Sequence, residues 1–296
     1  MPALQALAIF ATGLAAGTIN TVVGSGTLIT FPTLLAFGYP PVLANVSNNV
    51  GLVPGVASGV HGYRAELAGQ RRRIIRLGSA SVCGGLLGAI LLLVLPEGAF
   101  KAIVPALIGV AVVMVVIQPR LARWMAQRQV ARPAAARPAA GSGDGGDDGD
   151  GDAPLLGPPA GGAVAVGVLA ATDTARPAPA VGGPVLWFLV FCSGVYGGYF
   201  GAAQGVLLIG LLGIAFSDSL QRINAVKNVL AFLVNAVAAV MFIALTHVDW
   251  TIAGLIAAGS ILGGQVGARV GRRLPPWGLR LLIVCVGVAA LVKLLA

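Results

Sequence analysis

The chain has 296 residues, of which 57% are hydrophobic and 10% are charged. Soluble domains carry about 25% charged residues, so this composition excludes an ordinary soluble protein and indicates one that crosses a lipid bilayer. The formal net charge is +9, but the arginines flank hydrophobic stretches, as they do in the cytoplasmic loops of membrane proteins. The charge therefore does not predict a nucleic-acid partner.

The length of the hydrophobic stretches predicts an all-α, polytopic membrane protein. Apolar stretches of about 18 residues or more, long enough to span a bilayer, lie between the charge clusters. The short alternating segments typical of a transmembrane barrel do not occur in the sequence. We therefore expect an integral, multi-pass helical membrane protein.

The first part of the chain predicts five helical segments, one of them short. The short segment, 27–37, carries Pro32 and cannot cross about 30 Å of hydrocarbon at about 1.5 Å per residue. It follows the small residues Gly24, Ser25 and Gly26, which break the preceding apolar run. The segments are 4–23, 27–37, 41–63, one that ends at residue 95, and 100–117.

A segment of different composition follows, from 119 to 183. Residues 141–152 contain only Gly, Ser and Asp, and Ala, Pro and Gly dominate afterwards. Such a sequence cannot bury enough apolar surface to offset the entropy of ordering it. The predicted organisation is a first membrane repeat over 1–118, a disordered cytoplasmic linker over 119–183, and a second membrane repeat over 184–296.

The second repeat matches the first at a constant offset of 179 residues. Gly26 matches Gly205, Asn45 matches Asn224, and the proline that ends the fourth segment has its counterpart in Pro275. The sequence therefore predicts two homologous halves of about five segments, each with one short or broken segment. The segments of the second half are 185–200, 206–216, one that ends at residue 245, 252–270, and one from 279 to the end.

The distribution of arginine predicts that the two halves are inverted. The loop 64–76 has five arginines, whereas its counterpart 243–255 has no Lys or Arg; 269–280 has four arginines, whereas 90–101 has only Lys101. Equivalent loops with opposite bias fit an inverted repeat whose basic loops stay in the cytoplasm, with both termini outside. The alternative is that the short segments dip in and return, which gives eight crossings and parallel halves instead of ten crossings.

The breaks before the short segments are candidates for a substrate site. Broken segments at matching positions in two repeats point to the binding site of a transporter, because irregular backbone at membrane depth must line a cavity or be buried in protein. The candidates are Gly24, Ser25, Gly26, Gln204 and Gly205. The small residues of the two breaks leave backbone N–H groups available for a ligand. Close helix packing is the other role of small residues, and we prefer it for the glycines at four-residue spacing: Gly84, Gly88, Gly259, Gly263, Gly267 and Gly271.

Polar clusters follow each short segment at helical spacing. Asn45, Asn48 and Asn49 lie at i, i+3 and i+4, and so do Asn224, Lys227 and Asn228, so each cluster occupies one helix face. Helix starts favour anions, and an ionisable residue in a membrane segment suggests function. We predict that these six residues bind a small anion. Interhelical hydrogen bonding is an equally good explanation for any single Asn, and snorkelling to the interface is the alternative for Lys227.

The sequence contains no pattern for catalysis. There is no nucleophile with a base, no pair of carboxylates and no spacing that would hold a metal or a cofactor, so we do not expect an enzyme. His61 and His247 do not occupy equivalent positions in the repeats, and proton coupling through them stays open.

Several motifs together resemble the sulfite exporter TauE/SafE family of membrane permeases. They are Gly24-Ser25-Gly26 with Phe31-Pro32, Ala44 to Asn49, Gly62-Tyr63-Arg64, and Gly197 to Gly201 with Gln204-Gly205. The resemblance covers both membrane halves and leaves out the linker, which is longer than the connection usual in the family. It implies transport of sulfite, sulfonates or related small organic anions across the plasma membrane. It does not fix the substrate, the direction, the coupling ion or the oligomeric state.

The sequence thus predicts a secondary permease for small anions that works by alternating access at a site between the repeats. Two alternatives of other classes remain. One is a membrane scaffold that recruits a cytoplasmic partner through the linker without transporting anything. The other is a passive anion channel.

Overall fold

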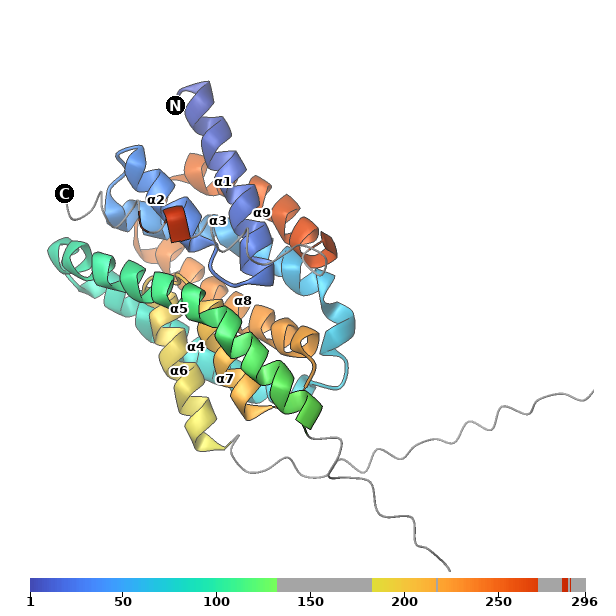
Figure 1. The fold of residues 1–296 in the computed structure, drawn as a ribbon. Coiled ribbons are helices and arrows are strands. Elements are labelled where there is room, and N and C mark those ends of the chain that lie inside the picture. The colour runs from blue at the N-terminus through green and yellow to red at the C-terminus, as the bar shows by residue number, and fades with distance from the viewer. Residues whose placement is uncertain (132–182, 217, 271–283, 287, 289–296) are drawn as a thin grey trace, which may run out of the picture.

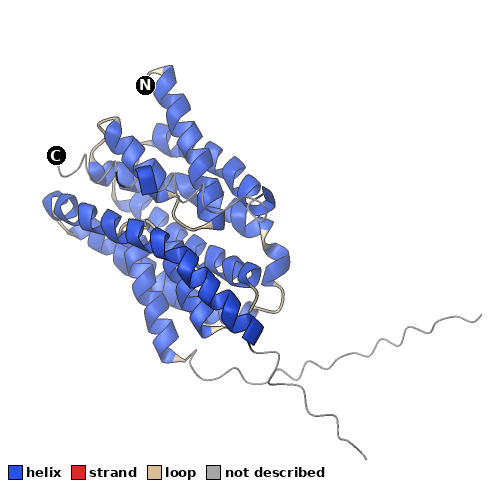
Figure 2. Ribbon diagram, viewed as in Figure 1, coloured by secondary structure: helices blue, strands red, loops and turns tan. Residues whose placement is uncertain are grey.

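The computed structural model describes residues 1–131, 183–216, 218–270, 284–286 and 288 (Figure 1). Every regular element within these ranges is a helix (Figure 2). The first half contains α1 (Ala3–Val22), α2 (Thr27–Ala36), α3 (Pro41–Gly62), the 3₁₀ helix η1 (Arg64–Leu67), α4 (Arg71–Val94) and α5 (Glu97–Ala131). The second half contains α6 (Pro184–Tyr199), α7 (Gln204–Ala215), α8 (Leu220–Leu245) and α9 (Trp250–Val270).

Five of the described helices, α1, α4, α5, α8 and α9, are long and apolar enough to cross a membrane. α3 also has 22 residues, but its polar residues keep it outside that set. The broken segments α2 and α7 have 10 and 12 residues, and at about 1.5 Å per residue they reach roughly half-way across the hydrocarbon core. The prediction of an all-helical membrane protein with a short, broken segment in each half is confirmed for these elements. In the second half α6, with 16 residues, is also shorter than the candidate spans.

Helix α5 is longer than predicted. We expected it to end near residue 117 and the linker to begin at 119, but α5 continues through Pro119 to Ala131. The residues after Pro119 are mostly Ala, Arg, Gln, Leu and Met, which are strong helix formers. Residues 119–131, which we expected to belong to the linker, are therefore helical. Residues 132–182 and most of the last predicted segment lie outside the described residues, so the linker's disorder stays a prediction.

The two halves pack into each other, so that helices of one half contact helices of the other. The first helix of each half packs most extensively against the fourth helix of the other half: α1 packs on α9, and α6 packs on α4. In Figure 1, α1 runs from the N-terminus at the top toward the centre, while α6 starts at the bottom and also ends at the centre. The ends of α1 and α6, and the breaks that follow them, therefore meet in the middle of the molecule.

Glycine makes this exchanged packing close. A Cβ atom at Gly263 would lie 2.1 Å from the carbonyl oxygen of Leu14, and one at Gly88 would lie 2.1 Å from that of Val195. These contacts join α9 to α1 and α4 to α6. The prediction that the regularly spaced glycines serve helix packing is confirmed where the structure describes them, at Gly84, Gly88, Gly259, Gly263 and Gly267; Gly271 lies outside the described residues.

Candidate functional site

The two breaks touch each other. The backbone N–H of Gly205 donates to the carbonyl of Gly24 at 3.1 Å, and a Cβ atom at Gly24 would lie only 2.4 Å from the Cα of Gly205. Small residues at both positions therefore let the two backbones approach closely. The expectation that the N–H groups of both residues in the second break stay free is wrong, because that of Gln204 also donates, to Gly201, at 3.4 Å.

The two breaks share an unusual backbone conformation. Gly24 has φ +89°, and its counterpart 179 residues later, Ala203, has φ 59° and is the only non-glycine with positive φ within the described ranges. The left-handed region costs a residue with a Cβ about 1–2 kcal/mol. This strain could not be seen in the sequence, because alanine carries no signal for it.

We expect Ala203→Gly to be nearly neutral for stability. Relief of the left-handed strain offsets the lost methyl group and the greater freedom of glycine in the unfolded chain, each worth roughly 1 kcal/mol. Ala202→Gly is the matched control, since Ala202 is equally buried and has no positive φ; it loses about 1 kcal/mol or more. Thermal unfolding in detergent measures both, and equal destabilisation of the two variants would contradict the role assigned to Ala203.

Lys227 lies next to this contact and is fully buried, with 0% of its surface exposed. Its Nζ donates to the carbonyl oxygens of Asn20 at 3.0 Å and of Thr21 at 3.3 Å. These carbonyls belong to the last turn of α1, where backbone acceptors lack helical partners and the helix dipole favours a cation. The side chain does not snorkel to the surface, which removes the alternative considered from the sequence.

The neighbours of Lys227 reach the same helix end. The Nδ2 atoms of Asn224 and Asn228 donate to the carbonyl of Thr21, at 3.1 Å and 3.4 Å. Three side chains from the first turns of α8 thus converge on the end of α1, in the other half of the chain. The predicted cluster Asn224, Lys227 and Asn228 is brought together by the fold.

The cluster of the first half makes the equivalent cross-half contact with one residue. Asn45 donates from Nδ2 to the carbonyl of Tyr199, the last residue of α6, at 3.0 Å. The other two asparagines diverge from it: Asn48 accepts from the hydroxyl of Thr30 at 2.5 Å, and Asn49 donates to Oδ1 of Asn235 at 3.0 Å. Asn48 occupies the position equivalent to Lys227, so only one of the two helix ends receives an ammonium group.

Several buried polar atoms of the predicted site residues have no hydrogen-bond partner. They are Oγ of Ser25, Nε2 of Gln204, and the Oδ1 atoms of Asn49 and Asn224. Ser25 and Gln204 are equivalent positions that flank the Gly24–Gly205 contact in sequence. Gly26 is different, since a Cβ atom there would lie 2.4 Å from the carbonyl of Ala16; it serves packing within the first half, and we no longer expect it to contact a ligand.

No carboxylate balances the charge of Lys227 among the residues that the structure describes. The ion pairs in this part of the chain are those of Asp218, with Arg73 and with Arg222. These three side chains are half-buried, and their ion pairs connect the start of α4 to the start of α8. A buried charge without a counter-ion is costly, and the partial negative charge of the α1 end compensates it only in part.

Sequence reasoning missed the acceptors of the site. The carbonyls of Asn20, Thr21 and Tyr199 receive the polar clusters, and Asn235 and Thr30 bind two of the asparagines. A usable signal was present, because a helix that ends at a break inside a membrane must have its last carbonyls satisfied. That signal does not say which side chains supply the donors, because each helix end is contacted by residues of the opposite half.

Comparison with known proteins places the chain in a family. Residues 9–294 match the family described as sulfite exporter TauE/SafE. A curated relative, "Probable membrane transporter protein ORF9" from Sinorhizobium sp, is 29% identical over 100 residues, which are 34% of this chain and 38% of the relative. The match thus spans about a third of that relative's length. No solved structure matches this chain.

The family match covers nearly the whole chain, including both breaks, both polar clusters and the helices that pack across the two halves. The family is one of transporters and not of enzymes. The chain is a multi-pass membrane protein and belongs to the sulfite exporter TauE/SafE family.

Proposed function

We propose that this protein is a secondary permease for a small anion, which binds where the two breaks meet. The observation that carries the proposal is the fully buried Lys227, whose ammonium group has carbonyl partners but no carboxylate among the described residues. An anion bound beside it would supply the missing counter-charge. Two of the three Nζ protons are used by the end of α1, and the third remains for a ligand.

The unpartnered groups define the rest of the proposed site. The hydroxyl of Ser25 and the amide N–H₂ of Gln204 are donors without acceptors, and both flank the contact between Gly24 and Gly205. An oxyanion with several acceptor oxygens would satisfy these donors together with Lys227. The family name points to sulfite, and sulfonates and related organic anions present the same oxygen chemistry. Asn45, Asn224 and Asn228 position the helix ends around this site through their carbonyl contacts.

We further propose an inverted repeat in the cell's plasma membrane, with the linker in the cytoplasm and alternating access between the halves. The opposite directions of α1 and α6 in Figure 1 support the inversion, and the opposite arginine bias of equivalent loops supports the orientation. Reporter fusions within the linker test the orientation; active reporters on the outside of the cell would contradict it.

Transport in proteoliposomes tests the function. Purified protein is reconstituted, and uptake of sulfite and of a panel of small sulfonates and carboxylates is followed with and without a pH gradient. The proposal predicts saturable flux of at least one anion, competed by its congeners, and a response to the gradient would establish proton coupling. Absence of flux for every anion, with the protein shown to be folded and inserted, would contradict the proposal, and flux that never saturates would indicate a channel.

A further inference from the structure

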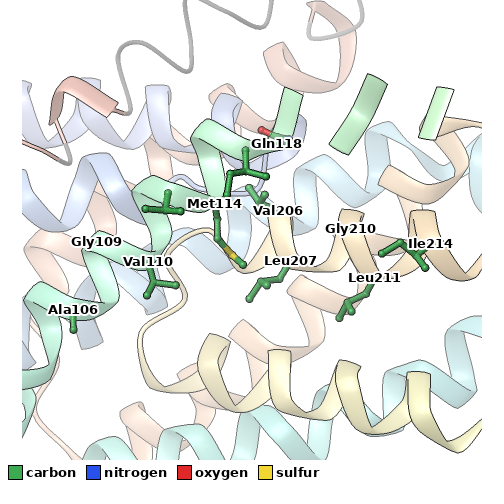
Figure 3. A pocket seen from close by; sticks show the side chains of 12 residues that line it. Ala106, Gly109, Val110, Met114, Gln118, Val206, Leu207, Gly210, Leu211 and Ile214 are labelled. Atoms are coloured by element: carbon green, nitrogen blue, oxygen red, sulfur yellow. The ribbon is translucent and has the colours of Figure 1, made fainter. Parts of the chain in front are cut away.

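An apolar groove lies between α5 and α7, outside the site described above (Figure 3). Its volume is about 590 Å³, which is within the range of about 300–1,000 Å³ that is usual for pockets that bind small molecules. The side chains at its rim are strongly exposed, with 51% for Val110, 54% for Val113 and 53% for Ile214. Since α5 is a candidate membrane span, the groove opens toward lipid.

One polar side chain interrupts this apolar surface. Gln118 lines the groove, is only 6% exposed, and its Oε1 is buried without a hydrogen-bond partner. It lies near the end of the candidate span Gly98–Arg120, where a spanning helix would reach the lipid head groups. An unsatisfied buried acceptor costs free energy, so a group that donates a hydrogen bond would be favoured there.

The sequence at this end of α5 is basic. Arg120 is exposed, and the sequence continues with Arg123, Arg128, Arg132 and Arg137, with no acidic residue before Asp144. Arginines near a membrane interface extend toward the head groups, and basic clusters there attract anionic lipids. The occupant favoured by this groove therefore combines an acyl chain, a hydrogen-bond donor and a negative charge.

We propose that the α5–α7 groove binds one anionic phospholipid, with phosphatidylglycerol as its best match. The acyl chain would lie along the apolar walls, a glycerol hydroxyl would donate to Gln118, and the phosphate would meet Arg120. The groove and its charges are separate from Lys227 and the breaks, so this lipid site does not depend on the identity of the transported anion.

Native mass spectrometry of the full chain, purified with a defined mixture of phosphatidylglycerol and phosphatidylcholine, tests the proposal. Gly109 lines the groove, and a Cβ atom there meets nothing within 4 Å, so Gly109→Leu fills the groove without a clash at its Cβ. Gly254→Leu is the matched control, since Gly254 is also a helical glycine with open space and lies on α9, away from the groove.

The wild type and Gly254→Leu are expected to retain one phosphatidylglycerol, and Gly109→Leu to lose it by about tenfold or more. Arg120→Gln is expected to remove the preference for phosphatidylglycerol over phosphatidylcholine. Equal retention in Gly109→Leu and the wild type would overturn the proposal. A wild type that retains neither lipid would also overturn it. So would a lipid-free dimer that Gly109→Leu disrupts, because a second copy of the chain would then fill the groove.

Discussion

Replacing Lys227 by glutamine is expected to weaken anion uptake strongly while leaving the protein folded and inserted. Glutamine can still donate to the carbonyl of Asn20 or Thr21 and keep the end of α1 capped, but it carries no charge. A hydrogen bond to a charged group contributes roughly 1.5–3 kcal/mol, which corresponds to a loss of about 10- to 100-fold in affinity for the anion. Initial rates of uptake in proteoliposomes over a range of anion concentrations measure the effect.

Two further variants separate charge from capping. Lys227→Met removes both, so it is expected to lose flux and also to unfold at a lower temperature, because the α1 carbonyls lose a buried donor. Arg222→Gln is the control for the loss of a positive charge near the start of the same helix, since its side chain is 38% exposed. Surface charges contribute only about 0–1 kcal/mol, so this variant is expected to have a small effect. Full flux in Lys227→Gln would show that Lys227 caps α1 and does not bind the substrate.

Gly205→Ala is expected to destabilise the protein strongly. The new Cβ would lie 2.4 Å from the Cα of Gly24 and 3.0 Å from its carbonyl oxygen, and backbone atoms cannot turn away as a flexible side chain does. Overpacking of a well-packed interior costs about 1–3 kcal/mol, and the hydrogen bond between Gly205 and Gly24 is lost when the breaks separate. Thermal unfolding in detergent gives the stability, and flux at a temperature where the variant is folded gives the function.

The control is Gly254→Ala, on α9, where the new Cβ meets nothing within 4 Å. A glycine replaced by alanine inside a helix gains up to about 1 kcal/mol, so this variant is expected to be at least as stable as the wild type. If Gly205→Ala behaved like Gly254→Ala, with full stability and flux, the close contact of the two breaks would not be needed for transport.

Much of the fold could be predicted because its signals are local. The breaks at Gly24 to Gly26 and at Gln204-Gly205 set the ends of the helices, and the apolar lengths between the charge clusters set their number. The structure places the ends of α1, α2, α6 and α7 within two residues of those expectations. The end of α5 could not be predicted in this way, because the change in composition from residue 119 suggested a linker, whereas the helix formers up to Ala131 continue the helix.

The site could be predicted only as a set of residues. The offset between the halves identified Lys227 and the asparagines, but the sequence within one half does not say which helix end the cluster meets. Lys227 reaches Asn20, 207 residues away, because the first helix of each half packs against the other half. The left-handed conformation of Ala203 is likewise imposed by the crossing of the breaks, since alanine alone disfavours it.

Equilibrium binding of sulfite to purified protein in detergent tests the anion site at Lys227, because it isolates the site from the transport cycle. Binding is measured for the wild type and for Lys227→Gln, with dimethyl sulfone as a neutral molecule of similar size. We expect saturable binding of the anion to the wild type, no saturable binding of the neutral molecule, and loss of anion binding in Lys227→Gln. Equal affinity of both proteins for sulfite would contradict an anion site at Lys227.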